Sequence, residues 1–102
     1  MNNDKFLNRI LNSIKKYDNR AEIILFGSRA RGDSKNDSDW DLLILLSKKA
    51  DEQLKEKIRD ELFEIELETD EVISSIIQSR KDWTNQQVTP LYQNIKQEGI
   101  KV

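Results

Sequence analysis

Two aspartates separated by one residue are the first feature of this sequence that could do chemistry. Asp39 and Asp41 precede the apolar run of residues 42–46. Residues two apart on an extended strand project to the same side, so these carboxylates lie together while Trp40 points the other way into the core. Like charges this close repel each other, and a divalent cation between them removes the repulsion. Carboxylate oxygens without His or Cys suit Mg²⁺ or Mn²⁺, so the pair predicts a site for one of these ions.

A glycine and a serine at the end of an earlier apolar run form the second chemical feature. Residues 23–26 are continuously apolar, and Gly27 and Ser28 follow them. Glycine lets the backbone approach a phosphate closely, and the free N–H groups of such a turn and a serine hydroxyl donate hydrogen bonds to it. Arg29 and Arg31 add positive charge to the same turn. The turn and the aspartate pair, joined by one loop, predict a site for a nucleoside triphosphate.

Composition limits both the chemistry and the partners. The 102 residues are enough for a single domain, which we assign to residues 1–102. The absence of Cys and His excludes thiolate catalysis, sulfur-ligated zinc and the commonest general base. A net charge of −2 argues against nucleic acid as a partner. No apolar run is long enough to span a membrane, and no export signal is recognisable, so we expect a cytoplasmic protein without membrane contact.

Seven elements in the order αβαβαβα are expected to position these residues. Apolar residues at helical or strand spacing place them at about 3–17 (helix), 23–26 (strand), 28–31 (short helical turn), 39–46 (strand), 51–67 (helix), 72–77 (strand) and 90–99 (helix). Residues 80–87 are expected to be irregular. The short link between the first two strands favours antiparallel pairing, and the long helix fits a parallel crossover. The predicted fold is therefore α/β, a three-stranded mixed sheet packed with helices.

The spacing of the two motifs resembles that of a known superfamily. Gly27-Ser28, ten intervening residues and then Asp39-Trp40-Asp41 is similar to the pattern of DNA polymerase β-type nucleotidyltransferases. The short chain and the GSRARG form resemble the minimal nucleotidyltransferases, the MNT or MntA-like antitoxin family. The resemblance implies the nucleotidyltransferase fold, with Gly27 and Ser28 on the β- and γ-phosphates of ATP and the two aspartates binding Mg²⁺. It also implies transfer of AMP to a tyrosine hydroxyl of a HEPN-type toxin, which would make this enzyme the antitoxin.

The sequence departs from the family pattern at a third carboxylate, which usually lies on the third strand. Residues 72–77 contain no acid, so Ser74 is the residue we place at that position, with Ser75 beside it. Asp70 and Glu71, just before the strand, are the alternatives. This departure leaves open a second function, an NTP-binding module that neutralises its partner by binding alone. Nucleotidyl transfer to a small molecule such as an antibiotic, in a pocket completed by a second subunit, is a third.

Overall fold

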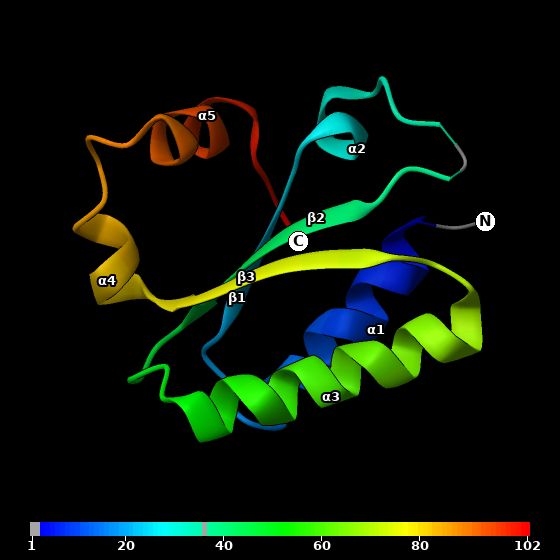
Figure 1. The fold of residues 1–102 in the computed structure, drawn as a ribbon, viewed down its shortest axis with the longest axis horizontal. Helices are drawn as coiled ribbons and strands as arrows, with labels where there is room; N and C mark the ends of the chain where they lie inside the picture. The colour runs from blue at the N-terminus through cyan, green and yellow to red at the C-terminus, as the bar shows by residue number, and fades with distance from the viewer. Residues whose placement is uncertain (1–2, 36) are drawn as a thin grey trace.

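A mixed β-sheet forms the centre of the computed structural model, which describes residues 3–35 and 37–102 (Figure 1). The strands in this part of the chain are β1 (Glu22–Phe26), β2 (Trp40–Leu46), β3 (Ile73–Ser79) and β4 (Ile100–Lys101). Their order across the sheet is β3-β2-β1-β4. Strand β2 is antiparallel to β1 and parallel to β3, and β4 is antiparallel to β1. The predicted directions of the first three strands are therefore confirmed.

Helices cover both faces of this sheet. They are α1 (Asn3–Lys15), α2 (Ser28–Arg31), α3 (Glu52–Thr69), α4 (Arg80–Thr84) and α5 (Pro90–Glu98). Helices α1 and α3 pack on one face, and α4 and α5 lie on the other (Figure 1). Among residues 3–35 and 37–102, no helix has the length and apolar composition needed to cross a membrane.

Alternation along β2 divides the buried side chains between two apolar clusters. Trp40, Leu42 and Ile44 face α1 and α3 and are fully buried. Leu43 and Leu45 face the opposite way, into the cluster that contains residues of α4 and α5. A strand buried on both faces reads as a continuous apolar run rather than as an alternating pattern, which explains the composition of residues 42–46. Trp40 belongs to the core, as its place in the strand predicts.

Two elements differ from the sequence prediction. Residues 80–87, expected to be irregular, contain helix α4, because Ser79 accepts a hydrogen bond from Asp82 N and caps it, while Trp83 is buried against the sheet. The predicted three-stranded sheet gains β4, whose residues carry no strand pattern of their own and are ordered by pairing with β1. Tertiary contacts therefore order β4, and the burial of Trp83 together with the local Ser79 cap orders α4.

Asp18 joins the segment before β1 to the residue after β2. It lies at the opposite end of these two strands from Gly27. Its buried carboxylate accepts hydrogen bonds from Ser47 N and Ser47 Oγ, each at 2.7 Å, and from Arg20 N at 3.1 Å. Burial acts to raise the pKa of Asp18, but the hydrogen bonds from Ser47 and Arg20 and the charge of Lys48 outweigh it and lower the pKa. The ionised carboxylate therefore stabilises the folded state.

We expect Asp18→Asn to lower the free energy of unfolding at pH 7 by about 1–3 kcal/mol, because the amide presents one acceptor where the carboxylate presents two. A pKa lowered by folding contributes stability above the unfolded-state pKa, and this contribution is lost as the pH falls through the folded-state pKa. Urea denaturation of both chains at pH 7 and at a series of acidic pH values measures the difference. It should shrink in acid, and a difference independent of pH would contradict the assignment.

Candidate functional site

The predicted site residues meet where β1 ends and β2 begins. Antiparallel register pairs Phe26 with Asp41, so the Gly27-Ser28 turn that follows β1 lies beside the start of β2. Asp39 is exposed and lies just before β2, while Asp41 is half-buried in it. Two motifs separated by ten residues in the sequence thus form one site at the same end of two neighbouring inner strands.

Gly27 brings the turn into direct contact with the aspartate pair. Its φ is +74°, a backbone conformation that favours glycine, and a Cβ at this position would lie 2.2 Å from Asp41 Oδ2. A side chain here would therefore displace the carboxylate as well as strain the backbone. The absence of a side chain is what allows the turn and the carboxylate pair to share one site.

The electrostatics of Asp41 suit a bound cation. Burial, and after it the negative charge of Asp39, raises the pKa of Asp41, while Arg31 acts in the opposite direction. A divalent ion would relieve the repulsion between the two carboxylates, so the donor set fits Mg²⁺ or Mn²⁺. Within the described part of the chain, no group of three or more His, Cys, Asp or Glu residues could hold a metal. The other ligands of an ion here have to come from phosphate oxygens and water.

Ser74 lies next to Asp41 in the sheet. The two residues are register partners in the parallel β2–β3 pair, so their side chains project from the same face. Ser74, which we place at the third-carboxylate position of the family, is thus adjacent to Asp41 and exposed.

The two alternative acids are placed differently. Glu71 accepts a hydrogen bond from Trp40 Nε1 at 2.9 Å, and by strand alternation the Trp40 side chain lies on the face of the sheet opposite Asp41. Asp70 ends helix α3 in the left-handed conformation, with φ +57°, and donates its backbone N–H to Glu66 O. The structure does not bring either acid to the face that carries Asp41 and Ser74 by strand register.

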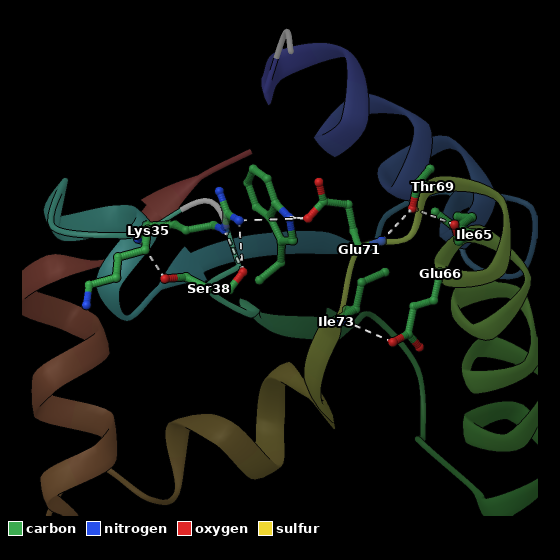
Figure 2. A network of polar contacts seen from close by, with 9 residues as sticks. Lys35, Ser38, Ile65, Glu66, Thr69, Glu71 and Ile73 are labelled. Carbon is green, nitrogen blue, oxygen red and sulfur yellow. Dashed lines mark hydrogen bonds and ion pairs between the residues drawn. The ribbon is translucent and has the colours of Figure 1, made fainter.

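Arg29 extends from the turn over Trp40. Its Cζ atom is 3.9 Å from the Trp40 ring centroid, and its side chain is only 10% exposed. Nε and Nη2 donate to Ser38 O at 3.1 and 2.8 Å, and Nη2 lies 3.8 Å from Glu71 Oε2 (Figure 2). These contacts hold the end of the loop that leads into Asp39. The sequence suggested a phosphate-binding arginine, and the structure shows Arg29 in contact with Ser38 O, Glu71 and Trp40.

We therefore expect Arg29→Ala to lower the free energy of unfolding by about 1–3 kcal/mol, because it removes a cation–π contact and leaves Ser38 O without its donors. Arg31→Ala is the matched control, since Arg31 is exposed and its loss should change stability by about 0.5 kcal/mol at most. Urea denaturation of the two variants measures both values. Equal destabilisation of the two variants would contradict a positioning role for Arg29.

Arg31 is the arginine of the turn whose positive charge acts to lower the pKa of Asp41. Its guanidinium pairs with Asp33 and with Glu98, with N–O distances of 3.3 Å in both cases, and these hydrogen bonds raise the pKa of Arg31. Glu98 was not among the predicted site residues. It lies on α5, 71 residues along the chain from Gly27, and no spacing or motif in the sequence connects the two.

The structure thus sets the Gly27-Ser28 turn against Asp41, where the two inner strands of the sheet meet. The chain belongs to the nucleotidyltransferase domain family, whose model matches residues 7–102. The family predicted from the motif spacing is thus confirmed. No curated protein sequence matches the chain.

Two solved structures share the fold. A chain of a toxin–antitoxin complex crystallised with AMP-PNP superposes with a TM-score of 0.65 and 19% identity, over 97% of this chain and 71% of that one. A chain of the MntA-HpeT toxin–antitoxin complex, a mutant with two aspartates changed to glutamate, gives a TM-score of 0.60 and 15% identity, over 92% of this chain and 69% of that one. At these identities the likeness shows the nucleotidyltransferase fold.

Proposed function

We propose that this protein transfers AMP from ATP to a tyrosine hydroxyl of a HEPN-type toxin and acts as the antitoxin of that protein. The observation that carries the proposal is the contact between the Gly27 turn and Asp41, which places an anion-binding backbone against a carboxylate pair suited to Mg²⁺. Membership of the nucleotidyltransferase domain family supports the reaction class. The toxin–antitoxin complexes among the structures of the same fold, one of them with AMP-PNP, support the partner and the nucleotide.

Each residue of the site has a role in this proposal. Gly27 N–H and the Ser28 hydroxyl bind the β- and γ-phosphates, and Arg31 adds positive charge beside them. Asp39 and Asp41 would hold Mg²⁺ or Mn²⁺, which neutralises the triphosphate and lowers the pKa of an acceptor hydroxyl. Arg29 keeps the loop before Asp39 in place.

The reaction forms a bond between the acceptor oxygen and the α-phosphorus and breaks the bond to the β-phosphate, releasing pyrophosphate. The hydroxyl proton has to leave as this bond forms. Ser74, beside Asp41, has no basic group to accept it, so in this proposal the proton goes to water or to a phosphate oxygen. We therefore expect transfer to be slow.

The exposure of the site favours a protein acceptor over a small molecule. Asp39 and Ser74 are exposed, and Val72, which shares a face with Ser74, is 51% exposed. The surface beside the carboxylate pair is thus open to a partner's side chain. A site for a small acceptor would need walls on this side, which a second subunit would have to provide.

A mass measurement tests this function. The chain is mixed with a purified HEPN-type toxin, ATP and Mg²⁺, and the intact mass of the toxin is followed with time. The proposal expects the mass to increase by one or more AMP units, and EDTA to prevent this. Neutralisation of the partner at stoichiometric ratio without any adduct would instead favour the second candidate, a binding module, for which the serine in place of the third acid is the motivating observation.

Nucleotide binding by the isolated chain should itself need a divalent cation. ATP brings several negative charges to the two carboxylates, so without a cation the repulsion opposes binding. Calorimetric titration with ATP and Mg²⁺ should show binding that is severely weakened in EDTA. Equal affinity in both solutions would contradict the metal site.

A further inference from the structure

The carboxylate of Glu98, the last residue of α5, lies in the turn that we assign to phosphate. Its Oε1 atom accepts a hydrogen bond from Gly27 N at 3.3 Å. Arg31 Nη1 donates to Oε1 and Oε2 at 3.3 and 3.4 Å. A carboxylate held by a backbone N–H and a guanidinium makes the same contacts as a phosphate oxygen. Glu98 thus uses two of the donors that the triphosphate needs.

We propose that Glu98 is an intramolecular competitor of the nucleotide, which closes the phosphate turn until a triphosphate displaces it. The inference rests on the proposed function, because it concerns the regulation of that same site. Glu98 and a triphosphate are both negatively charged and cannot share Gly27 N–H and Arg31. Binding therefore exchanges one anion for another, and the apparent affinity is reduced by the fraction of molecules in which Glu98 occupies the turn.

The packing of α5 determines what moves when Glu98 leaves. Ile95 is buried in the apolar cluster that contains Leu43 and Leu45 of β2. Tyr92 packs on Trp83 in the same cluster, with ring centroids 5.0 Å apart. Gly99 N donates to Ile95 O at 2.7 Å, and only two residue pairs join β4 to β1. The helix is thus anchored by its apolar side chains, while the segment after residue 98 is held to β1 by the short β4 pairing and by Val102 N, which donates to Ile23 O at 2.9 Å. Release of Glu98 loosens this segment first.

Close packing around Gly99 links the position of residue 98 to that of β4. A Cβ on Gly99 would lie 2.5 Å from Ile95 O and 2.6 Å from Ile24 Cγ2, so the chain passes close to β1 as it leaves the helix. A change in the direction of residue 98 is therefore transmitted to residues 100–102. Binding of a triphosphate in the turn, which displaces Glu98, and pairing of β4 with β1 therefore oppose each other.

Affinity measurements on three variants test the competition. Glu98→Gln removes the charge, and Glu98→Asp keeps the charge but shortens the side chain, so both weaken the contact with the turn. We expect each to bind ATP with Mg²⁺ about three- to tenfold more tightly than the unchanged chain, the range set by loss of a partly exposed ion pair. Glu52→Gln, at the start of α3, changes the net charge equally and should leave the affinity unchanged. Equal or weaker ATP binding by both Glu98 variants would overturn the inference. Tighter ATP binding by Glu98→Gln alone would also overturn it, because the gain would then come from the change in net charge.

Hydrogen exchange gives a second readout that does not depend on transfer. ATP with Mg²⁺ should speed amide exchange at residues 99–102 of the unchanged chain, and Glu98→Gln should show faster exchange there without nucleotide. Protection of these amides by nucleotide would overturn the inference. If ATP binds neither chain, the proposed function fails, and inorganic tripolyphosphate then decides on Glu98. Tighter binding of tripolyphosphate by Glu98→Gln supports the competition, and equal, weaker or undetectable binding overturns it.

Discussion

Asp41→Asn should reduce the rate of AMP transfer by about 10³-fold or more. Asp41 is one of the two carboxylates that we assign to the cation, and its loss halves the charge that this pair offers to a divalent cation, which contributes several kcal/mol to transfer. Single-turnover incorporation of AMP into the partner, followed by intact mass, measures this rate. The substitution should not unfold the protein, because burial and Asp39 already raise the pKa of Asp41 and the neutral amide removes that repulsion.

Asp37→Asn provides the matched control for this experiment. It changes the same charge at an exposed position of the loop before Asp39, so transfer should stay close to that of the unchanged chain. Thermal denaturation of both variants checks that each is folded. Transfer by Asp41→Asn at the rate of the control would show that Asp41 does not hold a catalytic ion.

Ser74→Asp should accelerate transfer by about 10²-fold or more. The β2–β3 register places residue 74 beside Asp41 on the same face of the sheet. A carboxylate there would accept the proton of the acceptor hydroxyl, and general bases typically contribute about 10²–10⁴-fold. The initial rate of AMP incorporation at saturating ATP and Mg²⁺ measures the gain.

Ser74→Asn separates this effect from a change of side-chain size. The amide has nearly the shape of the aspartate but no basic oxygen with a full charge, so it should leave transfer slow. If Ser74→Asp slows transfer instead of accelerating it, the added charge crowds a site in which Asp70 or Glu71 already serves as the third acid. In that case Glu71→Gln should slow transfer in the unchanged chain as well.

Local pattern alone was enough to predict the central part of this fold. The side-chain period of a strand is two, so the spacing of Asp39, Trp40 and Asp41 was sufficient to place Trp40 in the core. The short link after β1 and the long helix after β2 were sufficient to predict one antiparallel and one parallel pairing. These features depend on residues close together in the chain, whose relative geometry is set by the backbone itself.

The remaining features depend on contacts between distant segments. Arg29 and Arg31 are equivalent cations in the sequence, yet one lies on Trp40 and the other faces Glu98. That Ser74, and neither Asp70 nor Glu71, is the register partner of Asp41 follows from how β3 pairs with β2. Glu98 reaches Gly27 only because α5 packs across the sheet, and β4 exists only by pairing with β1. Short spacings in the sequence were enough to predict the elements other than α4 and β4, to predict the family and to single out the carboxylate pair. Which side chains complete or close the site was decided by tertiary packing, since no local spacing specifies how segments many residues apart come into contact.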